Sequence, residues 1–323
     1  MSAHRTLSRT VATAALALVA ALGLSGCAAQ GQDLPRQEIV IAGGVSGGIY
    51  AGYGAALAEV LGRELRVDAT ALSTAGSLEN LRLVGSGEAL LGFAQSDTAA
   101  DAIAGTGPFS EPLPIAGVAR LYEEYVHVVV RADSDVDQLS DLAGRAISLG
   151  APNSGVAAAA ARILAEAEVD PEQIDNPRLG LDDSLAALRA GEIEGFFWVG
   201  GLPTPGLQEF SQEVPIRLVS IEHRLVDRLN ERHGGVYRTA EFPAGLYGRD
   251  EVSVTMTVPN YLIVNEAVPD DVVRDALAAV FRTRAEVATR VPTAALLDRR
   301  LAIFTAPLEL HPGAAAYYRE TKH

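Results

Sequence analysis

The sequence predicts an α/β protein built from two similar lobes that face each other across a cleft. An apolar strand, a glycine turn and a helix occur in that order at residues 39–61 and again at residues 146–168. The string Gly87-Glu-Ala-Leu-Leu-Gly-Phe93 has a counterpart in Gly191-Glu-Ile-Glu-Gly-Phe196, and each follows a leucine-rich helix and starts a strand. Two copies of one strand–helix order predict two similar lobes. A cleft between lobes is the usual place for a small-molecule site.

The composition predicts a globular protein with a strong acidic balance. The chain has 323 residues, of which 48% are hydrophobic and 21% charged, which is enough length for two domains and a sizeable core. Its formal net charge is −15. This charge disfavours nucleic acid and an anionic membrane surface as partners. A bound anion would therefore be held by local N–H groups and one or two arginines.

The N-terminus predicts export and a lipid anchor. His4, Arg5 and Arg9 precede the apolar run 11–24, which is too short to span a bilayer as a mature helix, so residues 1–27 are expected to be a secretory signal peptide. The run ends in Leu24-Ser-Gly-Cys27, which looks like a bacterial lipobox and contains the only cysteine. We expect lipidation at Cys27, a polar tether over residues 28–37, and a location outside the cytoplasmic membrane, on the cell surface or in the periplasm. The alternative is an ordinary secreted protein with an incidental cysteine.

The first half of the chain offers ligand groups at three strand ends. The glycine turn 43–48 precedes a helix, where backbone N–H groups and the helix dipole favour a negative ligand group. A strand over 65–72 leads to the hydroxyls of Ser73, Thr74 and Ser77, which either cap the next helix or contact a ligand. Gln95 and Ser96 follow the strand 89–94, at the end of a strand where open α/β sheets place ligands. Asp97 is expected to cap the helix 98–104.

The middle of the chain predicts a crossing segment and a second cleft wall. Residues 114–131 have the pattern of a long strand pair that crosses between the lobes, with His127 as a core or edge residue. No cluster with metal-ligand spacing accompanies this histidine, and we expect neither a metal nor a cofactor. The second lobe would present Asn153, Ser154 and Gly155 from its glycine turn. Phe197 and Trp198, the only tryptophan, precede Gly200-Gly201 and are expected to form a cleft wall rather than core.

An ordered set of strings resembles a known family. In order and spacing the chain is similar to the TAXI family of solute-binding proteins, which serve tripartite ATP-independent periplasmic (TRAP) transporters. The strings that carry the resemblance cover residues 38 to about 320 and are Ser46-Gly-Gly-Ile-Tyr50, Thr74-Ala-Gly-Ser-Leu-Glu-Asn80, Ser86-Gly-Glu-Ala-Leu-Leu-Gly-Phe-Ala-Gln-Ser-Asp97, Leu121-Tyr122 with His127-Val-Val-Val-Arg131, Gly150 to Gly155, Phe242-Pro-Ala-Gly-Leu-Tyr247 and Leu310-His-Pro-Gly-Ala-Ala-Ala-Tyr-Tyr-Arg-Glu320.

The resemblance implies a fold, a partner and a set of contacts. It implies a two-lobed periplasmic-binding-protein fold of type II, with residues 38–123 and 258–323 in lobe 1 and 124–257 in lobe 2. It implies a monomer that captures a small carboxylate resembling glutamate or glutamine and delivers it to TRAP permease subunits in the membrane. The ligand contacts carried over from the family are Ser46, Gly48, Tyr50, Thr74, Ser77, Asn80, Gln95, Ser96, Ser154, Gly155, Phe197, Trp198 and Tyr247.

Some functional details stay open at this stage. Arg120 enters the crossing segment and is a candidate partner for a ligand carboxylate, with a surface salt bridge as the alternative. The family commonly has threonine where this chain has Ile49, so either the ligand differs or Ile49 points to the core. A sensing lipoprotein that signals to a membrane receptor would use the same cleft. An extracytoplasmic enzyme is not predicted, because no serine has a plausible base in a recognisable nucleophile arrangement and the only cysteine is expected to be lipidated.

Overall fold

A computed structural model describes residues 38–250 and 252–322. All of them belong to one compact unit, Gln37–His323. The predicted signal peptide, the lipobox Cys27 and the tether lie outside the described residues. Among the residues described, no helix is both long and apolar enough to cross a membrane.

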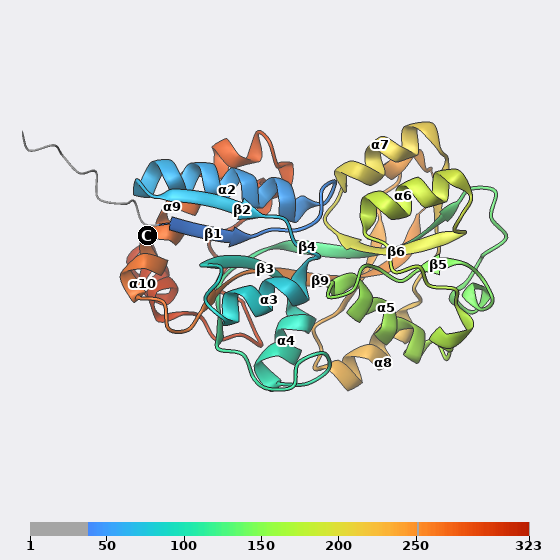
Figure 1. The fold of residues 1–323 in the computed structure, drawn as a ribbon, viewed down its shortest axis with the longest axis horizontal. Coiled ribbons are helices and arrows are strands. Elements are labelled where there is room, and N and C mark those ends of the chain that lie inside the picture. Colours follow the sequence, from blue (N-terminus) through green and yellow to red (C-terminus); the bar gives the residue numbers. More distant parts are fainter. Residues whose placement is uncertain (1–37, 251, 323) are drawn as a thin grey trace, which may run out of the picture. The chain divides into compact units, whose positions relative to one another are not determined.

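One sheet of nine strands organises this unit (Figure 1). The strand order is β2-β1-β3-β9-β4-β6-β5, while β7 pairs with β4 and β8 with β9. β1 runs parallel to β2 and β3, and β5 runs parallel to β6. The strands are β1 (Glu38–Ala42), β2 (Asp68–Leu72), β3 (Leu91–Gln95), β4 (Ile115–Arg131), β5 (Ile147–Ser148), β6 (Gly195–Gly200), β7 (Ile216–Leu218), β8 (Arg238–Phe242) and β9 (Ser253–Asn265).

Two long antiparallel strands, β4 and β9, run through the whole sheet. Their pairing extends from Ile115 opposite Asn265 to Tyr125 opposite Thr257, with irregular register between Gly117 and Ala119 and between Arg120 and Tyr122. The segment 114–131 was predicted as a strand pair, but it forms the single strand β4 and its partner comes from far along the chain. No turn interrupts the β-branched run, and the two register shifts absorb its irregular alternation.

Separate apolar cores lie on the two sides of this strand pair. One contains Leu57, Phe93 and Leu277, and another contains Ile163 and Leu229. We call β1–β3 with the helices packed on them the first lobe, and β5–β8 with their helices the second lobe. The first lobe has α2 (Ile49–Leu65), α3 (Ser77–Gly85), α4 (Ser96–Ala104), α9 (Asp270–Ala288) and α10 (Pro312–Glu320); the second has α5 (Gly155–Glu166), α6 (Leu181–Ala190), α7 (Pro205–Glu213) and α8 (His223–His233). This is the predicted type II periplasmic-binding-protein fold.

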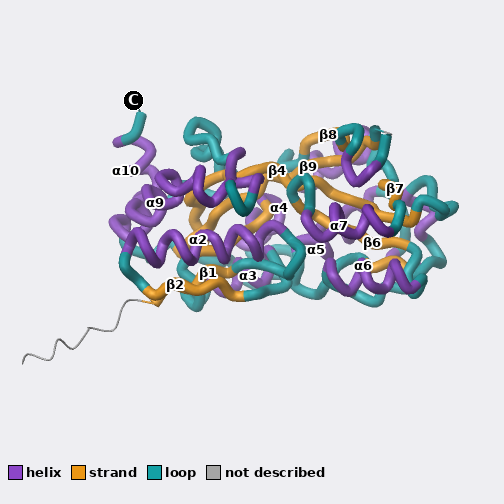
Figure 2. The backbone as a smooth tube through the Cα atoms, turned by 90° about the horizontal axis from the view of Figure 1, so that it is seen from above, coloured by secondary structure: helices purple, strands orange, loops and turns teal. Residues whose placement is uncertain are grey.

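The first glycine turn brings α2 close to the sheet. Gly47 has a φ of +72°, which a residue with a side chain rarely adopts, and a Cβ on Gly44 would lie 2.7 Å from the Cβ of Tyr50. Helix α2 then buries Leu57, Val60 and Leu61 as the sequence predicts. Its neighbour is α9, which lies beside it in Figure 2. The turn therefore places the start of α2 at the carboxyl end of β1.

Candidate functional site

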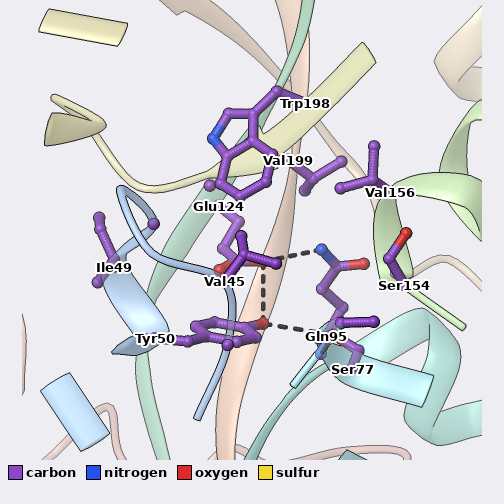
Figure 3. Close-up of a pocket in the computed structure, with 16 residues that line it drawn as sticks. Val45, Ile49, Tyr50, Ser77, Gln95, Glu124, Ser154, Val156, Trp198 and Val199 are labelled. Carbon is purple, nitrogen blue, oxygen red and sulfur yellow. Dashed lines mark hydrogen bonds between the residues drawn. The ribbon is translucent and has the colours of Figure 1, made fainter. Parts of the chain in front are cut away.

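A cavity between the lobes is lined by residues from the loops and helix starts of both (Figure 3). It holds about 380 Å³ of space not filled by atoms, open solvent at its mouth included. The lining residues are Gly44, Val45, Gly48, Ile49, Tyr50, Ala75, Gly76, Ser77, Gln95, Glu124, Ser154, Gly155, Val156, Trp198, Val199 and Gly200.

Four helices begin at this cavity. The residues that precede their first turns all line it, and they are Gly48 for α2, Gly76 for α3, Gln95 for α4 and Ser154 for α5. Only Ser154 caps its own helix, through a hydrogen bond from the Ala157 N–H to the Ser154 Oγ at 3.1 Å. The other three helix starts have no side-chain cap among the described residues. Their dipoles and N–H groups make this end of the cavity favourable for an anion.

The carboxyl group of Glu124 is the main ionisable group of the lining. Glu124 lies on β4 and is 1% exposed. Its Oε2 accepts hydrogen bonds from Gln95 Nε2 at 2.9 Å and Tyr50 OH at 3.2 Å, and its Oε1 accepts one from Tyr122 OH at 3.1 Å. Burial raises the pKa of this carboxyl to about 8, while these hydrogen bonds act in the opposite direction. The carboxyl is therefore largely protonated at neutral pH.

Tyr50 is held rigidly at the start of α2. Its ring stacks on Phe93 with the centroids 5.2 Å apart. Its hydroxyl accepts a hydrogen bond from Asn260 Nδ2 at 2.5 Å and donates to Glu124. Burial and the nearby Glu124 raise the pKa of Tyr50, so the phenol stays neutral. Figure 3 shows the Tyr50 hydroxyl between the side chains of Glu124 and Ser77.

Gln95 carries an unpartnered acceptor at the cavity. Its amide nitrogen donates to Glu124, which fixes the orientation of the amide and leaves Oε1 buried with no hydrogen-bond partner among the described residues. Gly155 of the second lobe lies against this oxygen, and a Cβ at that position would overlap the Gln95 side chain. A buried acceptor without a donor costs free energy, which a ligand donor would recover.

The second lobe contributes a largely apolar wall. Trp198, Val156 and Val199 face the polar groups of the first lobe in Figure 3. The Trp198 indole N–H donates to Thr204 Oγ1 at 3.1 Å, which fixes the ring. The ring edge lies 3.3 Å from where a Cβ on Gly48 would stand, so a residue larger than glycine would crowd the wall. This wall excludes water from the groups that it covers.

Among the residues described, the lining contains no lysine, arginine or histidine. Within the described part of the chain there is also no cluster of three or more histidine, cysteine, aspartate or glutamate side chains able to hold a metal ion. The cavity thus offers helix N-termini, hydroxyls, an amide and one carboxyl to a ligand. It can bind a small polar solute by hydrogen bonds.

Comparison with known proteins places the chain in a family. A family model described as NMT1-like matches residues 41–321. The chain belongs to the NMT1-like family. Two solved structures share its fold. MatC from Rhodopseudomonas palustris with bound malate is 17% identical, with a TM-score of 0.53, 90% of this chain covered and 98% of that one. PhnD1 from Prochlorococcus marinus in complex with methylphosphonate is 9% identical, with a TM-score of 0.51, 80% of this chain covered and 89% of that one. At these identities the likeness to the two solved structures shows a shared fold.

The cavity brings together several of the residues that the sequence predicts as ligand contacts. These side chains and turns come from four helix starts and from β6, and they are Gly48, Tyr50, Ser77, Gln95, Ser154, Gly155 and Trp198. Ile49 is 5% exposed and packs in the first-lobe core, and it also forms part of the cavity lining. Phe197 lines a smaller space next to the cavity, which it shares with Trp198.

Other residues that the sequence predicts as ligand contacts lie behind the cavity lining and support it. Thr74 and Asn80 bind the carbonyl oxygen of Gly43 at 3.0 and 2.7 Å, and Asn80 also donates to Phe93 O at 2.9 Å. They tie the first glycine turn to β3 and do not line the cavity. Ser96 is buried as the first residue of α4 and is also absent from the lining.

Three more expected contacts lie elsewhere. The guanidinium of Arg120 binds Glu123, three residues along the same strand, and lies outside the cavity lining. Tyr247 is 2% exposed in the second lobe, where its hydroxyl bonds to His127 Nε2 at 3.2 Å and to the Thr204 N–H at 3.0 Å. Ser46 binds the carboxylate of Asp182 across the lobes. Each of these side chains already has a partner within the chain.

Sequence reasoning missed Glu124, Gly76 and Val156. Glu124 stands in Tyr122-Glu-Glu-Tyr125, inside a run otherwise predicted as buried strand. An acidic residue in such a run was the available signal, because a buried carboxyl needs a reason. Val156 and Gly76 carry no chemical signal, since apolar side chains and glycines are common at helix starts.

A second polar cluster joins the lobes away from the cavity. Asp97 on α4 was predicted as a helix cap; Gln95 holds the cap position, and Asp97 lies in the first turn, where its Oδ1 accepts the Thr98 N–H at 2.7 Å. Asp97 Oδ2 accepts from Arg162 Nη1 of α5 at 2.6 Å and from the Tyr237 hydroxyl at 2.7 Å. Arg162 also binds Asp101. These contacts link a first-lobe helix to the second lobe.

Proposed function

We propose that this chain is the solute-binding protein of a membrane transport system and that it holds a small carboxylate between its lobes. The observation that carries the proposal is the convergence of four helix starts on one enclosed cavity. Helix N-termini attract anions through their N–H groups and dipoles. Because no cationic side chain lines the cavity among the described residues, these helix starts are the positive ends that the described lining presents to a carboxylate.

The first lobe would bind the solute and the second would cover it. Three of the four helix starts, together with Tyr50 and Gln95, belong to the first lobe, whereas the second lobe supplies Trp198 and two valines. Closure by a hinge is a common motion of proteins that enclose a ligand. The strand pair joins the lobes where Tyr125 lies opposite Thr257, and we place the hinge there.

The remaining assignments rest on the sequence. The ordered motifs support delivery to a TRAP permease, which would recognise the closed form. The Leu24-Ser-Gly-Cys27 string supports a lipid anchor that keeps the protein outside the cytoplasmic membrane. Labelling of Cys27 with a radioactive fatty acid in cells, with Cys27→Ser as control, tests the anchor.

Ligand screening tests the binding function. The chain without its signal peptide, residues 28–323, is mixed with glutamate, glutamine, malate and 2-oxoglutarate. A ligand at a hundred times its Kd adds about 2.7 kcal/mol to the free energy of unfolding, so the melting midpoint rises. The fluorescence of Trp198, the only tryptophan, should change with the same ligand. No rise with any of these solutes, together with turnover in an esterase or transferase panel, would contradict the proposal.

A glycine variant tests whether the cavity is the binding site. Gly155→Ala places a methyl group against Gln95 and Ser77, so the lobes cannot close fully and affinity should fall about tenfold or more. Gly52→Ala is the matched control, because it also adds one methyl group at a helical glycine and its nearest neighbour is Val291 at 3.6 Å. Equal ligand affinities for both variants would place the site elsewhere.

A further inference from the structure

We propose that Glu124 selects the solute by accepting a primary ammonium group on a ligand whose carboxylate faces the helix starts. This inference rests on the proposed function and narrows the solute to small amino acids or related zwitterions. It further assigns to this chain the release of one proton each time it is loaded. Among the residues that the structure describes, no ion pair provides a partner charge for this carboxyl.

The first support is the missing counter-charge. All three hydrogen-bond donors to Glu124 are neutral groups, two phenols and an amide. The described lining has no lysine, arginine or histidine. A buried carboxylate is ordinarily paired with a cation, because burial of an unpaired charge is costly. The open side of Glu124 is the cavity itself, so a ligand is the one remaining source of a cation there.

The second support is an excess of acceptors around Glu124. Gln95 Oε1 is unpartnered within the described residues, Gln95 is 2% exposed, and its amide points into the cavity. Asn260, whose amide nitrogen binds Tyr50, also has a buried Oδ1 without a partner there. A primary ammonium has three donors and no acceptor. It would satisfy ionised Glu124 and Gln95 Oε1 together, whereas a second carboxylate could accept a hydrogen bond from protonated Glu124 but would leave Gln95 Oε1 without a donor.

The other ionisable groups near Glu124 do not supply the missing counter-charge. Tyr50 on α2 and Tyr122 on β4 touch it, and burial keeps both phenols neutral by raising their pKa. Asp97 on α4 acts on Glu124 from a distance, and Arg162 binds the Asp97 carboxylate. The second-lobe residues of the lining carry no ionisable side chain.

Loading would therefore move a proton. Without a cation the Glu124 carboxyl holds its proton at neutral pH, because burial raises its pKa to about 8. An arriving ammonium keeps its own three hydrogens and stabilises the ionised carboxylate, so the Glu124 proton leaves to water. Affinity for an amino acid then rises with pH, by up to about tenfold per pH unit below pH 8. A ligand that takes a hydrogen bond from protonated Glu124 would show the opposite slope.

Calorimetry with matched ligands tests the proposal. Glutamate, glutamine and alanine are each compared with the 2-oxo acid and the 2-hydroxy acid of the same skeleton. We expect an amino acid to bind at least tenfold more tightly than its two counterparts. The observed heat should change with the ionisation enthalpy of the buffer, in the direction of proton release. Kd should be measured from pH 6 to pH 8.

Two variants test whether amino acid binding and proton release depend on Glu124. Glu124→Gln should weaken amino acid binding about tenfold or more and remove both the proton release and the pH slope. Glu123→Gln is the control, because Glu123 is the adjacent carboxyl on the same strand, binds Arg120 and lies outside the lining. It should bind like the native chain.

The possible failures are distinct. Tighter binding of a 2-oxo or 2-hydroxy acid, with proton uptake or none, overturns the role of Glu124 and leaves solute binding intact. Unchanged amino acid binding in Glu124→Gln, with a folded variant by circular dichroism, has the same meaning. If none of the nine ligands binds the native chain, the proposed function for small carboxylates fails and the inference fails with it.

Discussion

Two buried carboxyl groups of this chain have opposite surroundings. Asp97 and Glu124 are 2% and 1% exposed. Asp97 has a guanidinium at 2.6 Å and a phenol at 2.7 Å, both from the second lobe. Glu124 has three donors, all neutral and all from the first lobe or the joining strand. The chain therefore supplies its own cation where the lobes bind each other, and supplies none where a solute is to be enclosed.

Asp97 thus carries a charge that has its partner within the chain, whereas Glu124 is a carboxyl whose partner charge would come from a ligand. A buried ion pair needs both partners in place, and removal of one leaves a costly charge behind. At Asp97 the partner is permanent, so closed lobes satisfy it. At Glu124 the proton takes the place of the partner until a ligand arrives. Stability measurements on single variants should tell the two cases apart.

The largest expected effect is a change with pH in the free energy of unfolding of the ligand-free chain. The pKa of Glu124 is raised from 4.5 to about 8 in the folded chain. The folded state thus binds this proton more tightly than the unfolded state. The stabilisation of the folded state by the bound Glu124 proton is complete below pH 4.5 and is lost as the pH rises to about 8. At about 1.36 kcal/mol per pKa unit, the loss is at most about 5 kcal/mol.

Glu124→Gln should remove this loss. Urea unfolding at pH 5 and pH 8 would show the native chain losing more free energy of unfolding between the two values than the variant does. Subtracting the two chains cancels the groups that they share. Equal losses would mean that Glu124 already has a cationic partner in the free protein, and the contrast with Asp97 would disappear.

The next effect concerns Arg162. Arg162→Met leaves Asp97 buried without a cation, and breaking a buried pair costs about 3–5 kcal/mol. We expect a loss of about 3 kcal/mol in urea unfolding at pH 7. Arg189→Met is the control, since Arg189 and its partner Glu213 are 52% and 69% exposed. An exposed pair contributes about 1 kcal/mol or less. If both variants lose equally little, the lobes separate easily and water solvates Asp97.

The smallest effect concerns the other carboxylate bound to Arg162. Asp101 is 16% exposed at its side chain, and its pKa is raised by burial more than Arg162 lowers it. Asp101→Asn leaves the Arg162–Asp97 pair in place, so we expect a loss of about 1 kcal/mol in the same assay. A loss as large as that of Arg162→Met would make Asp101, and not Asp97, the main partner of the guanidinium.

The sequence predicted the fold more completely than it predicted which residues line the cavity. The repeated strand–turn–helix order at Gly43–Gly48 and Gly150–Gly155 is local, and both copies form the expected helix starts. The site depends on which side of a long strand each residue faces. β4 has register shifts near Gly117 and Arg120, so alternation along the strand does not reveal that Glu124 faces the cavity while Glu123 binds Arg120. Where the register shifts, the rule that alternate residues of a strand face the same side of the sheet no longer predicts the correct side.

Partners from distant parts of the chain account for the other differences. Thr74 and Asn80 hold the carbonyl oxygen of Gly43, a contact between separate turns that spacing alone does not indicate. Asp97 looks like a cap because it follows a strand, but its partner Arg162 is 65 positions away. Seven of the expected contacts nevertheless line the cavity: Gly48, Tyr50, Ser77, Gln95, Ser154, Gly155 and Trp198.

The strand pair β4 and β9 has a consequence for how the chain acquires its structure. β3 of the first lobe pairs with β9, which ends at Asn265, whereas the second lobe is built from the continuous stretch between β4 and β9. As the chain emerges from its N-terminal end, the strands of the second lobe and the first half of β9, which pairs with β8, become available before the second half of β9, which pairs with β3. We therefore expect the second lobe to fold early, and the first lobe to finish only when β9 returns.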